Sequence, residues 1–242
     1  MSHRRDQKEA LRRERQEREA AAKAAAQRKR MVGLGLAGVL AVAVVAVLIL
    51  LVAGGGDDGG GGSQASSDVL PDGGSVPEQQ QLELRPAAQA AGCELRTVNV
   101  PKPPPQGYHT TSLEEKIKYA TNPPSGGRHY EIPAEDGAYS EAPPDEALVH
   151  ALEHGRVIVW FKPSLPEGAR ADVKALFDED EYQMIVVPRS KMPYALAATA
   201  WNGDPAPGRG QLLLCDKVDD RTWDAVRTFR DENRSRGPEP VP

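Results

Sequence analysis

Hydrophobic residues follow two different patterns along the chain. Residues 31–53 form one uninterrupted apolar run, and no charged residue stands between Arg30 and Asp57. A helix of that length, at roughly 1.5 Å per residue, reaches about 34 Å, which exceeds the roughly 30 Å hydrocarbon core of a bilayer. Residues 31–53 are therefore predicted to form a transmembrane helix, and the lipid bilayer is its predicted partner.

Beyond residue 92 the apolar residues occur in short runs separated by Pro, Gly and polar clusters, as in a folded domain. Ser112 with Glu115 has the spacing of a capping box, and an Asp precedes the last periodic segment. The periodicity predicts helices at 112–119, 146–154, 169–177 and 220–233, and strands at 157–161, 184–187, 196–201 and 211–215. This order predicts an α+β domain in which helices pack on a mixed sheet.

Composition divides the chain into five segments. Gly, Ser, Asp, Gln, Pro and Ala dominate residues 54–91, and such a composition buries too little apolar surface to offset the entropy of ordering. The predicted segments are a basic tail at 1–30, the transmembrane helix at 31–53, a flexible linker at 54–91, one domain at 92–236 and a C-terminal tail at 237–242.

Charge is distributed unevenly about the apolar run. Residues 1–30 contain eleven Lys or Arg against five Asp or Glu, whereas the rest of the chain contains nineteen against thirty. The positive-inside rule places the basic tail in the cytoplasm and the acidic domain outside. We therefore expect a single-pass plasma-membrane protein with an extracytoplasmic C-terminal domain. The alternative is a cleaved signal peptide, whose apolar region is shorter, about 7 to 15 residues.

The N-terminal segments also bear on possible partners. Acidic residues alternate with the basic residues of the tail and dilute its positive field, so no nucleic-acid partner is expected. Within the apolar run, Gly33, Ala37 and Ala41 repeat at four-residue spacing, which would let two helices approach closely. Homodimerisation through the transmembrane helix is therefore an open alternative.

The chain contains two cysteines, Cys93 and Cys215, near the two ends of the predicted domain. On the oxidising side of a membrane, two such residues are expected to form a disulfide. The alternative is a pair of buried free thiols. Since the chain has no CxxC motif, redox catalysis is not expected.

Four of the five histidines lie within residues 109–154. His150 and His154 stand at i and i+4 on a predicted helix, so both imidazoles project from one face and could bind a single ion. His129 ends a Pro- and Gly-rich loop that could deliver a third ligand, and His109 could complete the set. The sequence predicts a transition-metal site built from these four histidines.

The identity of the metal depends on further ligands. Zinc suits a site composed of imidazoles, whereas copper would be favoured if Met184 or Met192 entered the site. Both metals are therefore candidate cofactors.

His150, Glu153 and His154 also form the pattern HxxEH, which is the inverted zinc-protease motif in which the Glu activates a metal-bound water. Against a hydrolase, Gly155 ends the helix at once, and no long companion helix is predicted to carry a distal Glu ligand. Glu153 is instead expected to support a ligand by hydrogen bonding.

Enzyme activity is accordingly not favoured by the sequence, and no GxSxG, P-loop or dinucleotide-binding motif is present. A small zinc hydrolase is one alternative to a metal-binding domain. The other is a non-catalytic module that binds an unknown envelope protein through its Trp- and Tyr-containing loops, with the histidines hydrogen-bonded as structure.

Several motifs together resemble the bacterial family called domain of unknown function 3105 (DUF3105). They are YATNPPSGGRHY at 119–130, the residues 137–139, VHALEHG at 149–155, VIVWF at 157–161, MPYALAATAW at 192–201 and the region of Cys215. The resemblance covers about 150 residues, from Cys93 to near Pro240. It implies a single-span envelope protein whose histidine motifs are family signatures, and it implies no established activity. One departure is visible, because residues 125–128 read Ser-Gly-Gly-Arg where the family commonly has Thr-Ser-Gly-Pro.

Overall fold

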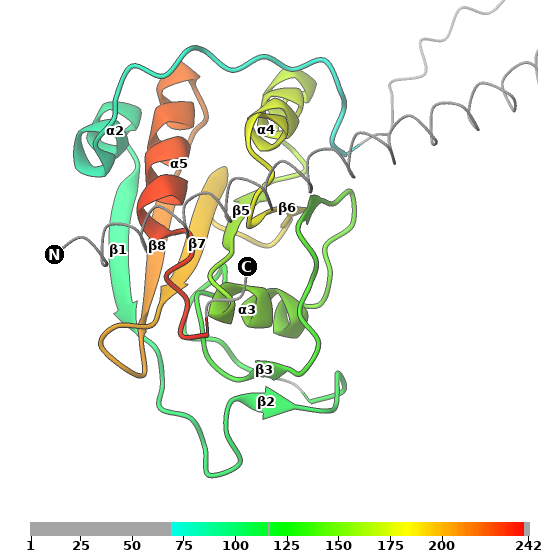
Figure 1. Ribbon diagram of the computed structural model, residues 1–242. Helices are drawn as coiled ribbons and strands as arrows, with labels where there is room; N and C mark the ends of the chain where they lie inside the picture. The colour runs from blue at the N-terminus through cyan, green and yellow to red at the C-terminus, as the bar shows by residue number, and fades with distance from the viewer. Residues whose placement is uncertain (1–68, 116, 240–242) are drawn as a thin grey trace, which may run out of the picture. The chain divides into compact units, whose positions relative to one another are not determined.

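The computed structural model describes residues 69–115 and 117–239 (Figure 1). Within these ranges, no helix has both the length and the apolar character needed to cross a bilayer. The predicted transmembrane helix at 31–53 and the basic tail at 1–30 lie outside the described residues. The membrane span, its orientation and its dimerisation therefore stay predictions.

A six-stranded mixed sheet forms the centre of the domain, with the strand order β1-β8-β7-β5-β6-β4. Strands β4, β6 and β5 are paired in parallel, whereas β5, β7, β8 and β1 are paired antiparallel. The strands are β1 (Glu94–Asn99), β4 (Gly137–Ala138), β5 (Val157–Phe161), β6 (Met184–Pro188), β7 (Leu196–Asn202) and β8 (Arg209–Cys215). A separate parallel pair is formed by β2 (His109–Thr110) and β3 (His129–Tyr130).

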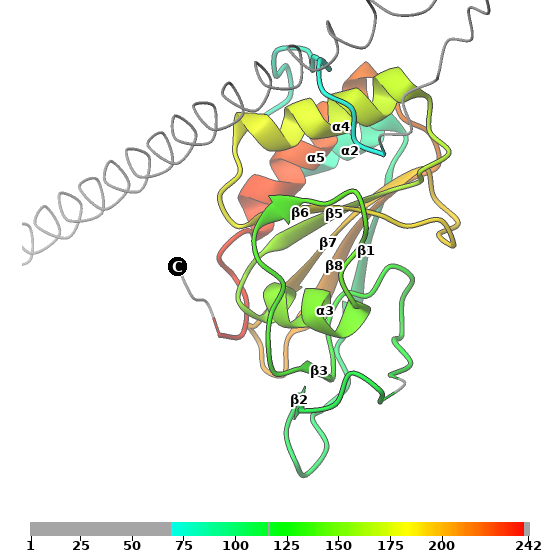
Figure 2. The same ribbon diagram turned by 90° about the vertical axis from the view of Figure 1, so that its right-hand side faces the viewer.

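Helices cover both faces of the sheet, as Figure 2 shows. On one face lie α2 (Leu84–Ala91), α4 (Glu167–Glu179) and α5 (Asp220–Asn233), and on the other lies α3 (Asp145–Glu153). Successive side chains of a strand point to opposite faces. In β5, accordingly, Val159 packs in the core beneath α4 and α5, and Trp160 packs in the core beneath α3. This double burial explains why β5 is apolar at every position.

The predicted α+β class is confirmed, and the long elements lie where the periodicity places them. β5 has the predicted bounds, and so does α5. The Asp219 side chain caps α5 by accepting the N–H of Arg221, while the Thr222 hydroxyl accepts the N–H of Asp219. Strong local signals of this kind determine where the main elements begin and end.

The predicted disulfide between Cys93 and Cys215 is also confirmed. Cys93 lies just before β1, and Cys215 is the last residue of β8. The bond joins residues separated by 122 positions in the sequence, so it ties the edge strand β1 to the strand beside it.

The predicted helix at 112–119 is wrong for the residues that the structure describes. The two side chains of the predicted capping box make other contacts. The Ser112 hydroxyl accepts the N–H of Glu114 in a local turn, and the Glu115 carboxylate accepts hydrogen bonds from Arg128. A capping signal without an apolar stripe behind it is not sufficient to form a helix.

The prediction of a flexible linker at 54–91 is wrong for residues 69–91, which pack on the domain. Ala87 and Ala88 of α2 are buried against the core under α5. The Asp224 carboxylate of α5 accepts the backbone N–H groups of residues 80 and 81. The alanines of this segment contribute to the linker-like composition of the sequence. In the structure, their small side chains allow α2 to approach α5 closely.

Candidate metal centre

Two histidines are brought together by the pairing of β2 with β3. His109 lies directly opposite His129 in this parallel pair, although twenty positions separate them in the sequence. Side chains at opposed positions on neighbouring strands contact each other. The two imidazole rings are accordingly 4.7 Å apart between centroids.

The loop before β3 is held by two glycines and an arginine. Gly126 and Gly127 have φ of +142° and +126°, which side-chain-bearing residues rarely adopt, and a Cβ on Gly126 would lie 2.9 Å from the Trp201 ring. Arg128 donates two hydrogen bonds, of 2.7 and 3.1 Å, to the Glu115 carboxylate. Arg128 therefore anchors the loop that carries the adjacent histidine.

Helix α3 delivers the remaining residues of the HxxEH motif. Positions i and i+3 share one face of a helix, so His150 and Glu153 project from the same side of α3, and His154 is the residue that caps its C-terminus. The helix is attached to β3 by the Nδ1 atom of His150, which lies 2.7 Å from the carbonyl oxygen of Tyr130. Gly155, with φ of +85°, then turns the chain out of the helix.

The Glu153 carboxylate lies among three imidazole nitrogens. Its Oε2 atom is 3.0 Å from Nε2 of His129, 3.3 Å from Nε2 of His109 and 4.0 Å from Nε2 of His150. Across these four residues, one potential ligand atom from each lies within 4.8 Å of all the others. Ligands at about 2.0 to 2.2 Å from a tetrahedral zinc ion lie roughly 3.3 Å from one another, so the observed spacing is close to that of a metal site.

Backbone carbonyls determine which nitrogen of the two buried rings faces the cluster. Nδ1 of His129 lies 2.7 Å from the carbonyl oxygen of Gly127, and Nδ1 of His150 makes its equivalent contact with Tyr130. A carbonyl oxygen only accepts, so both Nδ1 atoms donate a proton. In the neutral ring Nε2 then carries a lone pair, which is how metal-binding histidines are commonly oriented.

This tautomer creates an unfavourable contact inside the cluster. Nε2 of His129 and Oε2 of Glu153 are both buried, and neither has a hydrogen-bond partner of suitable geometry. The His129 side chain is 0% exposed and that of Glu153 is 5% exposed. Two lone-pair atoms 3.0 Å apart repel each other unless a cation, either a proton or a metal ion, lies between them.

Electrostatics favour the deprotonated state that metal ligands require. Burial, followed by repulsion from the neighbouring imidazoles, lowers the pKa of His150 to about 4. Burial would raise the pKa of Glu153, but a proton shared from His129 and the proximity of the other imidazoles outweigh it, so the pKa lies below its ordinary value. Both groups are therefore unprotonated at neutral pH.

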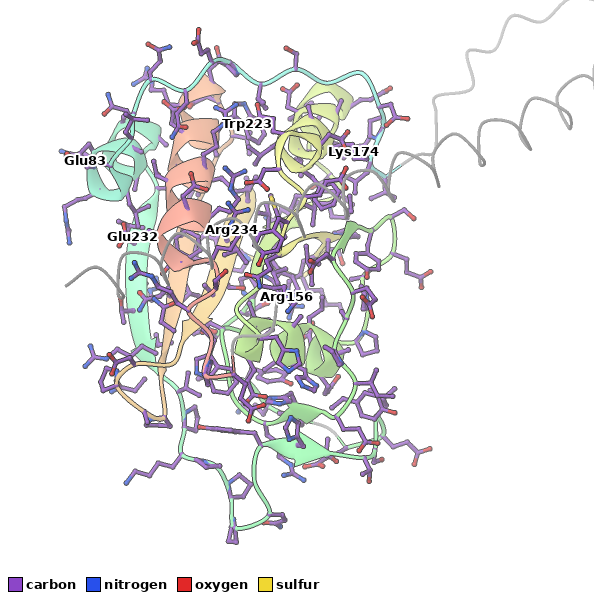
Figure 3. All side chains as sticks on the ribbon, viewed as in Figure 1. Glu83, Arg156, Lys174, Trp223, Glu232 and Arg234 are labelled. Atoms are coloured by element: carbon purple, nitrogen blue, oxygen red, sulfur yellow. A yellow bond between two sulfur atoms is a disulfide. The ribbon has the colours of Figure 1, made fainter. Side chains whose placement is uncertain are left out.

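The sequence predicts His129, His150 and His154 as ligands of one ion, but the structure places His154 in a different group. Its Nε2 atom is 3.1 Å from Nε2 of His150, but it is grouped with Glu153 and Glu239 instead of with His109 and His129. Burial, and next the charge of nearby Arg156, lowers the pKa of His154. Figure 3 shows the labelled Arg156 close to α3.

Glu153 and Glu239 are the residues whose position the sequence does not predict. Glu153 was expected to support a ligand, whereas its oxygen lies among the nitrogens themselves. The sequence spacing is consistent with this position, because Glu153 stands three residues after His150 and therefore shares its helix face. No sequence signal marks Glu239, which is brought to α3 by the chain beyond α5.

The surroundings of the cluster are apolar on one side and open on another. Tyr108 stacks on His129 at 6.1 Å between centroids, and Trp201 meets the same ring edge-on at 6.0 Å. The His109 side chain, by contrast, is 46% exposed. Of the methionines considered as copper ligands, Met184 packs in the core on the opposite face of the sheet, and Met192 packs in the apolar core beneath α3.

Comparison with known proteins identifies the family. The family described as "Protein of unknown function (DUF3105)" matches residues 109–241, which is more than half of the chain. The protein therefore belongs to this family, as its motifs indicate. No curated protein and no solved structure matches the chain. The matched region contains all of the residues of the cluster and begins at His109.

Proposed function

We propose that this DUF3105 protein is a membrane-anchored, extracytoplasmic protein whose domain binds a divalent transition metal. The proposed ligands are His109, His129, His150 and Glu153. The contact between Nε2 of His129 and Oε2 of Glu153 carries the proposal, because both atoms are buried and without a hydrogen-bond partner. A metal ion between them would use both lone pairs at once and turn a repulsive contact into two favourable bonds.

The donor set favours zinc, with copper(II) as the second candidate. Three imidazole nitrogens and one carboxylate oxygen suit borderline metals. No thioether is among the proposed ligands, since Met184 packs on the far face of the sheet and Met192 packs in the apolar core beneath α3. Three neutral imidazoles and one carboxylate leave a bound divalent ion with a single net positive charge. The exposed side at His109 is then suited to a water or anionic ligand.

The disulfide supports an extracytoplasmic location for the domain. Bonds of this kind persist in oxidising compartments and are rare in the cytosol. Together with the apolar run at 31–53 and the basic tail before it, the bond between Cys93 and Cys215 favours an anchor with the domain outside. Protease treatment of intact cells tests this placement, because it should degrade the domain and leave the tail.

Metal analysis of the full-length chain, purified in detergent, tests the metal proposal. We expect at least one equivalent of zinc in the wild-type protein, and we expect His129→Gln to lose the zinc of this site. Because His129 is fully buried, its replacement could also disturb folding. His109 is exposed, so His109→Ala should keep the fold and retain zinc more weakly. His3→Gln is the matched control, since this histidine belongs to the basic tail.

Two results would contradict the metal proposal. The first is a wild-type protein that binds neither zinc nor copper, which would favour the non-catalytic interaction module. In that case His129 and Glu153 would be a buried pair that shares a proton. Unchanged metal content in both histidine variants would assign the metal to other residues. A hydrolase instead requires Glu153 beside a metal-bound water, and a measured turnover that Glu153→Gln abolishes while metal is retained would favour it.

A further inference from the structure

A second group of potential ligands adjoins the first and shares one residue with it. The group consists of Glu153, His154 and Glu239, and again one ligand atom from each lies within 4.8 Å of the others. We infer that this group holds a second divalent transition-metal ion, with the Glu153 carboxylate bridging the two ions. The inference rests on the proposed function, because it requires Glu153 to be a ligand of the first ion.

The chain beyond α5 is held against the end of α3 by backbone hydrogen bonds. The N–H of Ser235 donates to the Gly155 carbonyl at 2.9 Å, and the N–H of Glu239 donates to the Glu153 carbonyl at 3.0 Å. Gly237 lies between them so close to α3 that no Cβ could be accommodated there. Figure 1 shows this last segment, in red, descending from α5 toward α3. The position of Glu239 beside Glu153 is therefore built into the fold.

His154 is not among the four ligands proposed for the first ion. Nδ1 of His150 donates to Tyr130, so Nε2 of His150 has one lone pair to give. If that lone pair binds the first ion, it cannot accept a proton from Nε2 of His154, which is 3.1 Å away. The two nitrogens then repel each other unless His154 also binds a cation. The two carboxylates grouped with it, those of Glu153 and Glu239, would supply the other ligands of that cation.

The Glu153 carboxylate has the capacity to bridge. Its two oxygens together carry about four lone-pair positions, and carboxylates hold paired metal ions about 3.5 to 4 Å apart in two-metal sites. Glu153 is buried, His154 is partly buried and Glu239 is exposed. The second ion should therefore be nearer to solvent and bind more weakly than the first.

Zinc titration of the metal-free, full-length protein against a chromophoric chelator tests the inference. We expect two equivalents per chain in the wild type, and one equivalent of unchanged affinity in Glu239→Gln and in His154→Gln. Glu232→Gln makes the same chemical change on an exposed residue of α5, labelled in Figure 3, and should retain two equivalents. X-ray absorption of the zinc-loaded wild type should show a metal–metal vector near 3.5 to 4 Å that is lost in Glu239→Gln.

Each contrary result has a distinct meaning. One equivalent in the wild type, unchanged by Glu239→Gln, would overturn the second ion and leave the first in place. No bound zinc in any protein would overturn the proposed function itself. If His154→Gln weakens the single ion while Glu239→Gln does not, His154 is a fifth ligand of one ion and the inference fails.

Discussion

The two faces of the sheet differ in what they bury. The face under α4 and α5 is a continuous apolar core, in which Trp223 and Phe229 are almost fully buried, and the disulfide closes it at the edge. The face under α3 begins as an apolar core around Trp160 but passes into a cluster of imidazoles and a carboxylate. One face supplies stability mainly through hydrocarbon burial, whereas the other contains a buried imidazole and a buried carboxylate in contact, each with an atom that lacks a hydrogen-bond partner.

Removing the disulfide should have the largest effect, and it should act on stability alone. In the chain-entropy model, a bond across 122 positions contributes about 5 kcal/mol, so Cys93→Ser with Cys215→Ser should lower the free energy of unfolding by about 2 to 5 kcal/mol. Urea denaturation measures this change. Zinc affinity of the protein that remains folded should not change, and a parallel loss of affinity would show that the two faces are not separable.

Glu153→Gln should separate metal binding from stability on the α3 face. The substitution removes the only negative charge among the proposed ligands of the first ion, and zinc affinity should fall on the order of 100-fold or more. The metal-free protein should keep its stability, because a glutamine amide can donate to the lone pair of His129 Nε2.

The same variant distinguishes a metal site from a proton-sharing pair. If His129 and Glu153 form a buried ion pair instead, removing one charge should lower the free energy of unfolding by about 3 to 5 kcal/mol. Denaturation of metal-free wild type and Glu153→Gln, side by side, decides between the two.

Acidification should weaken the α3 face through His150. The pKa of His150 is about 4 in the folded protein, against an ordinary 6.5, so the unfolded chain binds more protons between these values. Stability of the metal-free protein is unaffected above pH 6.5 and falls progressively as the pH drops toward 4. Glu153, whose pKa is also lowered, adds to this loss below its ordinary 4.5.

Thermal unfolding of the metal-free protein between pH 7.5 and pH 5 measures this dependence. His150→Gln should make the profile less steep, and His154, whose pKa is also lowered, accounts for the slope that remains. A wild-type profile that stays level from pH 7.5 to pH 5 would contradict the assignment of His150 as a buried neutral ring.

Arg128→Gln should have the smallest effect, about a tenfold loss of zinc affinity. The variant breaks the two hydrogen bonds to Glu115 and loosens the loop that positions His129 without touching a ligand. Arg96→Gln is the matched control, because Arg96 pairs in the same two-bonded way with Glu94 on the edge strand β1. Equal affinity in the two variants would show that the loop needs no anchor.

The face that provides stability was the easier one to predict from the sequence. β5 and α5 have strong periodicity, and α5 also has a capping box, so local residues alone indicate their bounds. β1 is not predicted from the sequence because, as an edge strand, it has no continuous apolar run. The position of α2 depends on how alanines pack against α5, which periodicity does not register.

The site could be predicted in its residue types but not in its arrangement. His150 and His154 are four residues apart in a predicted helix, so their shared face is predictable. The pairing of His109 with His129 depends on two strands of two residues each, and the approach of Glu239 depends on the whole domain between it and α3. Contacts of this kind arise from tertiary structure and leave no local pattern.

Nitrogen NMR of the His129 imidazole, recorded on the full-length protein at pH 7.5 before and after zinc is added, shows whether this ring binds the metal. We expect that Nδ1 keeps its proton in both states, because it donates to Gly127, while Nε2 changes to the shift of a metal-bound nitrogen. A spectrum in which Nε2 carries a proton before zinc is added, and does not change afterwards, would contradict the metal proposal.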